Sequence, residues 1–240
     1  MTSPCPIRQI VSTVRAKRER RKEARPGELL DAALDLFLEK GFAATRVEEV
    51  AQRAGVSKGT LFLYFSSKEE LFKAVVRENI SGRFTEWAEE LKTYEGSSED
   101  LLRYCMTSWW ERVGNTKASG IPKLMMSEAG NFPELVAFFQ QEVVQPGNAL
   151  IVRILERGVE RGEFRAVDPV YGVYSVLAPM TFLMMWKHGR GSCGDARIAL
   201  DPHQYIASQV KTILHGLSIT PAASASPPSS EPREPKKKPR

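Results

Sequence analysis

The chain has 240 residues, a formal net charge of +5 and 42% hydrophobic residues. This hydrophobic fraction is too high for a chain disordered throughout, and no apolar run reaches the roughly 20 residues that a membrane-spanning helix needs. The N-terminal segment also lacks the apolar stretch of about 7 to 15 residues found in secretory signals, so we expect a cytoplasmic protein.

The positive charge lies at the two ends of the chain. Residues 1–26 carry a net charge of +6 and residues 220–240 carry +3, whereas residues 27–80 and 81–219 each carry −2. A basic arm before an ordered module is typical of a segment attracted to phosphates, although basic runs also serve as solubilising tails. We therefore expect a flexible basic arm over 1–26. The Ser-, Ala- and Pro-rich segment 218–240 cannot bury a core and is predicted to be a disordered tail.

Helical spacing and capping signals follow the basic arm. Apolar residues recurring at three and four positions predict a helix over about 27–40, and Gly41 is expected to end it. Thr45 and Glu48 form a capping box, which predicts a short helix to about Arg53.

Two more helices are predicted before residue 95. Ser57 can cap a short helix that runs to Phe62 or Leu63. Ser67 begins a second capping box, which predicts a long helix to about Tyr94.

Ala51, Gly55 and Leu61 are spaced as in a helix-turn-helix. Two short helices that cross need a small residue at the crossing, here Ala51, and a turn residue with positive φ, here Gly55. Leu61 then packs the second helix onto the first. An ordinary helical hairpin is the alternative, but the capping signals and the basic arm favour the helix-turn-helix.

The runs GFAATRVEEVA from Gly41, AGVSKGTLFLYF from Ala54 and KEEL from Lys68 resemble the N-terminal DNA-binding domain of TetR-family transcriptional regulators. The resemblance covers about 28–76, and Arg161–Arg165 followed by Asp168-Pro169 resembles the junction before the last two helices of these proteins. The resemblance implies an all-α homodimer whose C-terminal domain binds a small molecule and thereby releases the N-terminal domains from a palindromic operator in double-stranded DNA. The implied domains are a three-helix helix-turn-helix domain over 27–76 and a helical effector-binding and dimerisation domain over 77–217.

The same resemblance carries a DNA-binding role to nine positions. Arg46 is the first choice for a base contact, because its forked donors suit guanine O6 and N7. Tyr64 and Lys68 match positions that usually touch phosphates. Phe62 replaces the family's usual Tyr, which removes one phosphate contact, and core packing is the alternative role for this ring. The full predicted set is Thr45, Arg46, Ser57, Lys58, Gly59, Thr60, Phe62, Tyr64 and Lys68.

The pattern of apolar residues from 95 to 217 also predicts helices. This region is rich in aromatic and methionine side chains. The predicted helices are 99–113, 121–127, 133–161 with a kink at Pro146-Gly147, 169–188 and 202–217. A single such residue is more often core than ligand site, yet the set is rich enough to line an apolar cavity. We predict an apolar or aromatic effector. The candidate ligand-binding residues are Tyr104, Trp109, Met126, Phe138, Phe139, Tyr174, Leu177 and Met180.

The last two predicted helices, 169–188 and 202–217, carry broad apolar faces that a monomer would have difficulty burying. In the family these two helices pair with their symmetry mates, and a two-fold dimer presents its recognition helices about 34 to 36 Å apart. The predicted dimer interface consists of Val173, Val176, Met184, Ile206, Val210, Ile213 and Leu214.

The sequence gives little support for an enzyme or for a metal-binding protein. Residues 189–194 match the dinucleotide pattern GxGxxG but follow a predicted helix rather than a strand, which favours a flexible loop. The three histidines lack metal-ligand spacing, and Cys5, Cys105 and Cys193 are too far apart for a disulfide framework. We therefore expect no catalysis, no metal and no cofactor. Two functions remain: a ligand-responsive repressor, or a small-molecule-binding or interaction protein with only non-specific DNA association.

Overall fold

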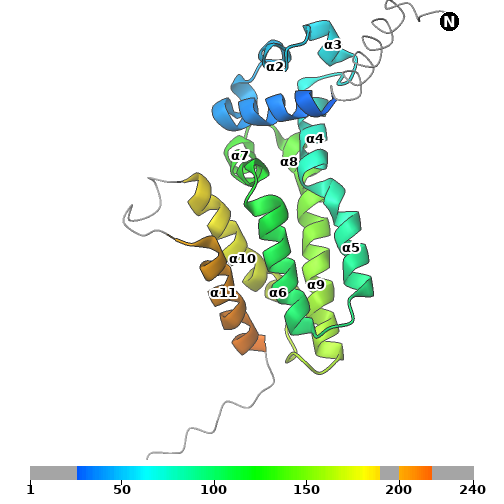
Figure 1. The fold of residues 1–240 in the computed structure, drawn as a ribbon, viewed down its shortest axis with the longest axis vertical. Coiled ribbons are helices and arrows are strands. Elements are labelled where there is room, and N and C mark those ends of the chain that lie inside the picture. The colour runs from blue at the N-terminus through cyan, green and yellow to red at the C-terminus, as the bar shows by residue number, and fades with distance from the viewer. Residues whose placement is uncertain (1–25, 190–199, 218–240) are drawn as a thin grey trace, which may run out of the picture.

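The structure is a computed structural model that describes residues 26–189 and 200–217. Within these ranges every regular segment is helical, so the predicted all-α fold is confirmed. Figure 1 shows an elongated molecule with the N-terminal helices across one end and the remaining helices along its length. In the described ranges no helix combines the length and the hydrophobicity needed to cross a membrane. After a first helix over 26–44, the helices are α2 (Val47–Arg53), α3 (Lys58–Phe62), α4 (Lys68–Asn79), α5 (Phe84–Thr93), α6 (Ser98–Trp109), α7 (Ile121–Glu128), α8 (Pro133–Phe139), α9 (Gln145–Glu160), α10 (Pro169–His188) and α11 (Pro202–Leu217).

The predicted turn at Gly55 is confirmed, whereas the first helix does not end at Gly41 as predicted and continues to residue 44. Gly41, near the end of the first helix, has a φ of +83°, and Gly55, between α2 and α3, has a φ of +67°. Only glycine adopts such angles at little cost. Ala51 and Leu61 are buried on either side of the second turn, so α3 packs back onto α2 as a helix-turn-helix requires.

The long helix predicted from Ser67 to Tyr94 is wrong. α4 ends at Asn79, a 3-10 turn follows over Ser81–Arg83, and α5 begins a new helix at Phe84. The turn depends on Gly82, because a Cβ there would lie 2.8 Å from the Arg77 carbonyl oxygen. The break gives α5 a direction of its own alongside the body of the molecule (Figure 1).

A kink was predicted at Pro146-Gly147, but the helix is irregular in the turn before these residues. A π-helical segment, Gln140–Val144, joins α8 to α9. Pro146 has no N–H to donate, and its ring crowds the carbonyl four residues before it, so the preceding turn widens. A second π-helical segment, Trp110–Gly114, ends α6.

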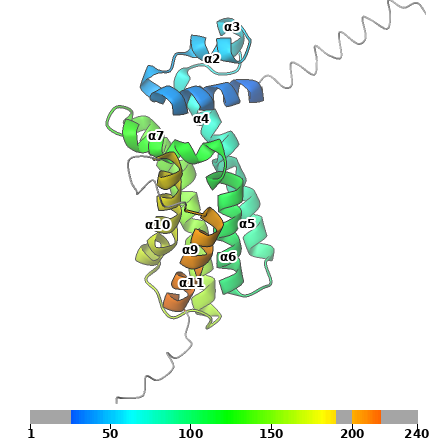
Figure 2. The ribbon, with the colours of Figure 1, turned by 60° about the vertical axis from the view of Figure 1, so that its left-hand side comes forward.

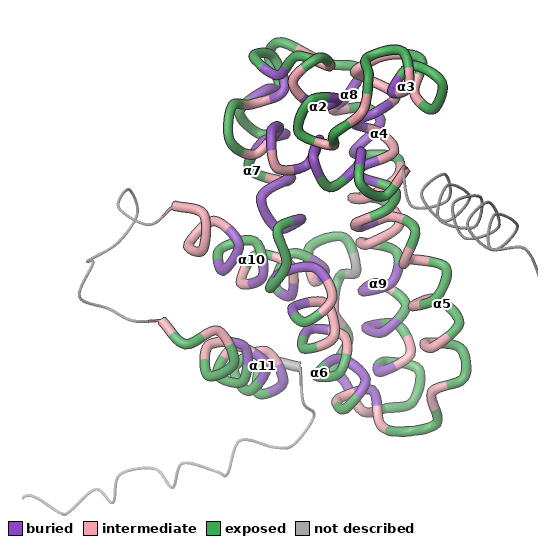
Figure 3. The backbone as a smooth tube through the Cα atoms, turned by 45° about the horizontal axis from the view of Figure 1, so that its top comes forward, coloured by how far each residue is buried: buried purple, intermediate pink, exposed green. Residues whose placement is uncertain are grey.

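Two clusters of buried side chains form the core (Figure 3). The first joins the first helix, α2, α3 and α4 to α7 and α8, and the rings of Phe42 and Phe132 meet edge to face with centroids 4.7 Å apart. The second joins α6, α9, α10 and α11. The N-terminal helices therefore share a core with α7 and α8 instead of packing only among themselves.

The close packing of α9 against the following loop can be tested at Gly158. A Cβ on Gly158 would overlap the buried ring of Phe164. We expect Gly158→Ala to lower the free energy of unfolding by about 1–3 kcal/mol, measured by urea denaturation. Gly216→Ala in α11 is the matched control, because nothing lies within 4 Å of its Cβ. Equal stability of the two variants would contradict this packing.

Candidate nucleic-acid interface and ligand cavity

The short helix α3 is fixed at its start and exposed on its outer face. Ser57 caps it as predicted, its Oγ accepting a hydrogen bond from the Thr60 N–H at 3.1 Å. Leu61 is the buried side chain of this helix, whereas Lys58 and Gly59 are exposed. The sequence thus places a small helix at the end of the molecule with its polar start open to solvent (Figure 1).

Phe62, Leu63 and Tyr64 form an exposed apolar run after this polar start. The alternative role of Phe62 in core packing is wrong, because the ring is exposed and contacts the Lys58 ammonium 5.6 Å from its centroid. Leu63 is 83% exposed and Tyr64 is also exposed. Exposed apolar side chains that lie together are typical of a surface that contacts a partner.

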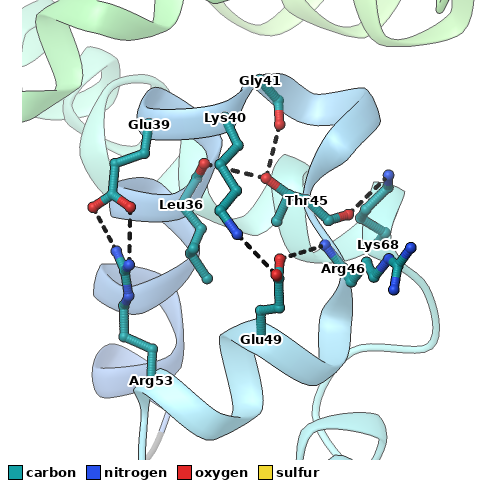
Figure 4. A network of polar contacts seen from close by, with 9 residues as sticks. All are labelled: Leu36, Glu39, Lys40, Gly41, Thr45, Arg46, Glu49, Arg53 and Lys68. Atoms are coloured by element: carbon teal, nitrogen blue, oxygen red, sulfur yellow. Dashed lines mark hydrogen bonds and ion pairs between the residues drawn. The ribbon is translucent and has the colours of Figure 1, made fainter.

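Arg46 and Thr45 lie side by side but have different surroundings (Figure 4). Arg46 is exposed and is the N-cap residue of α2, and its backbone N–H donates to Glu49 Oε2 at 3.4 Å. Its guanidinium has no hydrogen bond or ion pair within the described ranges. The predicted capping role of Thr45 is wrong. Its hydroxyl faces the carbonyl oxygens of Gly41 at 2.7 Å and Leu36 at 3.1 Å, and the residue is only 1% exposed, so this side chain cannot touch DNA.

Lys68 has a structural role instead of the predicted contact with phosphate. Its Nζ donates to the carbonyl oxygens of Phe42 at 2.9 Å, Ala43 at 3.2 Å and Thr45 at 3.2 Å. An ammonium group has three donors, and all three are used here. Lys68 therefore satisfies carbonyl groups left unpaired where the first helix ends.

Glu128 links the C-terminal part of the chain to the same junction, and sequence reasoning did not find it. It is a buried side chain on α7, and its Oε1 accepts a hydrogen bond from the Ala43 N–H at 3.1 Å. The pairs Lys40–Glu49 and Arg53–Glu39 hold α2 to the first helix from outside (Figure 4). Hydrogen bonding to Lys40 lowers the pKa of Glu49. Because these two pairs are exposed, each contributes little to stability.

A cavity of about 240 Å³ lies among α5, α6, α9 and α10. Its wall is mainly apolar. Of the eight predicted ligand-binding residues, those that line it are Tyr104, Trp109, Phe139, Leu177 and Met180. The expected apolar cavity is therefore present, built in part from side chains that the sequence indicated.

Three of the predicted ligand-binding residues lie elsewhere. Met126 is 66% exposed and Tyr174 is 56% exposed, so both point outward. Phe138 packs beneath Lys73 and Arg77 of α4, with the Arg77 guanidinium 5.0 Å from its ring centroid. Each of these three residues is on a helix that contributes other residues to the cavity wall, but its own side chain does not line the cavity.

The polar groups in the cavity wall come mostly from residues that sequence reasoning missed. Glu90 accepts hydrogen bonds from the Tyr104 hydroxyl and from Arg112, both at 3.0 Å. Burial raises the pKa of the Cys105 thiol to about 12, so it stays protonated at neutral pH. The missed residues with polar groups are Trp87, Glu90, Cys105, Ser108, Asn148 and Thr181. The helical spacing of Phe84, Trp87 and Leu91 would have indicated that they share one face of α5, if α5 had been recognised as a separate helix.

The predicted dimer interface is wrong as a set. Ile213 is half-buried and packs against the second core cluster, and five other side chains lie within that cluster: Val173, Val176, Ile206, Val210 and Leu214. Met184 is buried and lines the cavity. The cluster joins α10 to α9 and α11, and α11 to α6, inside one protomer. The exposed apolar side chains of α10 are instead Val170, Tyr171, Tyr174 and Phe182.

Other predictions fall on residues outside the described ranges. They concern the basic arm up to Arg25, the glycine-rich loop from Arg190, and the tail from Ser218, together with Cys5 and Cys193.

Two family models match the chain and together cover more than half of it. "Bacterial regulatory proteins, tetR family" matches residues 29–75, and "Tetracyclin repressor-like, C-terminal domain" matches residues 95–201. The chain belongs to the TetR family of transcriptional regulators. The predicted family and its role in DNA-binding transcription regulation are thereby confirmed.

Some similar proteins match most of the chain, and others match only a shorter part of it. The HTH-type transcriptional repressor KstR2 of Mycolicibacterium smegmatis is 28% identical over 186 residues, which are 77% of this chain and 88% of KstR2. The regulator RutR of Escherichia coli is 50% identical over 62 residues, 26% of this chain and 29% of RutR. Among solved structures, FadR of Bacillus subtilis in complex with stearoyl-CoA has a TM-score of 0.65 at 19% identity, covering 79% of this chain and 97% of FadR.

The structural role of Lys68 can be separated from a phosphate contact. Lys68→Met leaves three carbonyl groups without their donor, so we expect the free energy of unfolding to fall by about 1–3 kcal/mol in thermal or urea denaturation. Lys92→Met on α5 is the control, because Lys92 makes an exposed surface pair with Glu89 at 2.6 Å. The salt dependence of DNA binding should be the same for Lys68→Met and wild type. If the slope of log affinity against log salt concentration is smaller by about one in Lys68→Met, Lys68 contacts a phosphate and the structural assignment is wrong.

Proposed function

We propose that this regulator is a homodimeric repressor that binds a palindromic operator through Arg46 and α3 and is released when a small apolar molecule fills its cavity. The observation that carries the proposal is the pairing of two features in one chain. The exposed helix α3 and the exposed Arg46, whose guanidinium has no partner among residues 26–189 and 200–217, lie at one end, and an apolar cavity of about 240 Å³ lies in the body. The name of the related KstR2, a transcriptional repressor, supports the direction of regulation.

The exposed surface of α3 suits the major groove of DNA. Gly59 has only the Ser57 Oγ, at 3.7 Å, near the position of a Cβ, so the backbone can approach the groove closely. Arg46 offers two donors to a guanine, and Leu63 offers an apolar contact to a thymine methyl group. We assign Tyr64 and Lys58 to the flanking backbone, although Lys58 must first leave its 2.6 Å pair with Glu48.

The segment between the cavity and the DNA-binding helices provides a route for release. Val113 and Pro122 line the cavity, and α7 begins at Ile121. At the other end of α7, Glu128 holds the Ala43 N–H just before α2. A ligand that displaces the end of α6 would therefore shift α7 and, with it, the loop that positions Arg46. A ligand acts in this way only if it binds one arrangement better than the other.

Dimerisation is assigned to the outer face of α10. Tyr171 is 74% exposed and Tyr174 is 56% exposed, with Val170 and Phe182 on the same helix. Large apolar side chains exposed together on one helix are typical of an interface. A two-fold dimer through α10 would give the operator its two-fold symmetry.

The first experiment is selection of bound duplexes from a random-sequence library by the purified protein at about 0.15 M salt. We expect a two-fold symmetric consensus. Arg46→Ala should weaken binding to it by about 1–3 kcal/mol and relax one base position, measured by titration of labelled duplexes. The exposed Arg103 of α6 supplies the control variant, Arg103→Ala, which should bind as wild type. Absence of a consensus, with binding lost as salt rises, would favour non-specific association instead.

The dimer face is tested by introducing charge. The double variant Tyr171→Glu, Tyr174→Glu brings four carboxylates together at the two-fold interface, so its dissociation constant should rise more than about tenfold. Analytical ultracentrifugation at micromolar concentration measures this change. Lys92→Glu on α5, a surface charge change, is the control. A wild-type protein that sediments as a monomer, or a double variant that stays dimeric, would exclude this face.

A further inference from the structure

Two residues that line the cavity each carry a polar atom without a hydrogen-bond partner within the described ranges. The atoms are Trp87 Nε1 on α5 and Ser108 Oγ on α6, and both are buried within the wall. Buried donors are normally satisfied, and one left unpaired costs free energy. Because both residues line the cavity, a rotation of each side chain would bring its donor to the cavity surface, where a bound molecule supplies the missing acceptor.

The charge of the cavity wall excludes two classes of occupant. Among the described lining residues, Glu90 is the charged one, and it is already paired with Arg112 at 3.0 Å. An anion entering the cavity would meet this carboxylate and find no cation free to pair with it. A cation would have to compete with Arg112. Either ion would also lose its hydration in a mainly apolar cavity.

The surroundings of Cys105 agree with this description. The thiol lines the cavity, and burial raises its pKa, so a negative charge at this position is unfavourable. The volume of about 240 Å³ is slightly below the roughly 300–1,000 Å³ of most ligand pockets, which indicates a small occupant.

We infer that the cavity selects an uncharged, mainly apolar small molecule with an oxygen that accepts hydrogen bonds from the Trp87 indole N–H and the Ser108 hydroxyl. A ketone, an ester or an alcohol belongs to this class. A carboxylate, an ammonium compound and a plain hydrocarbon do not. The inference rests on the proposed function and narrows its effector to one chemical class.

The test is isothermal titration of the full chain, without DNA, with four two-ring probes of similar size. They are 2-acetylnaphthalene, 2-ethylnaphthalene, 2-naphthoate and 2-naphthylmethylammonium. We expect the ketone to bind most tightly, with the hydrocarbon about 2- to 10-fold weaker because it lacks the acceptor, and the two ions weaker still. Tightest binding by either ion, or no binding of the ketone at millimolar concentration, would overturn the inference.

Variants of the two polar residues locate the effect. Trp87→Phe and Ser108→Ala should each weaken ketone binding about 2- to 10-fold and leave hydrocarbon binding within about twofold. Trp186→Phe and Ser127→Ala are the matched controls, because neither residue lines the cavity. Unchanged ketone affinity in Ser108→Ala, a small change that α6 should tolerate even if Trp87→Phe unfolds, would also overturn the inference. These titrations contain no DNA, so their failure leaves the operator selection unaffected, and a failed selection leaves them unaffected.

Discussion

The carbonyl and N–H groups left unpaired where the first helix ends fix the geometry of the DNA-binding unit. Three elements supply their partners: Thr45 from the segment before α2, Lys68 from α4 and Glu128 from α7. Because buried polar groups must be paired, none of these elements can move far without losing a hydrogen bond. Arg46 follows Thr45 directly, so the side chain proposed to read a base is placed by the same network. Lys68, which the sequence predicted to contact a phosphate, thus helps to position the proposed interface.

This junction also joins the two parts of the molecule. The first core cluster includes α7 and α8, and α7 lies against the N-terminal helices in both ribbon views (Figures 1 and 2). Lys117, just before α7, pairs with Asp35 of the first helix at 2.6 Å. The cavity lies at the other side of this contact, where Val113 and Pro122 form part of its wall. In the proposed mechanism, ligand binding and DNA binding act on the same short segment, which provides a route for a coupling free energy between the two sites.

Local signals made most helices predictable, and long-range packing explains the errors. Ser57 and Gly55 were found because capping and positive φ are properties of a few adjacent residues. The predicted dimer residues of α10 were wrong because α10 is apolar around its whole circumference, so its pattern does not say which side packs on α9 and α11. Trp87 was missed because the break before α5 depends on the close approach of Gly82 to a carbonyl group, which the sequence pattern does not reveal.

The most direct measurement of the proposed coupling is amide hydrogen exchange of the full chain with and without the selected operator duplex. DNA bound only through Arg46 and α3 should slow exchange there and also across 117–128, because Glu128 and Lys117 hold that segment to the DNA-binding helices. It should alter exchange in the helices around the cavity as well, since coupling between two binding sites is reciprocal. Protection confined to the first helix, α2, α3 and α4 would contradict a link through α7.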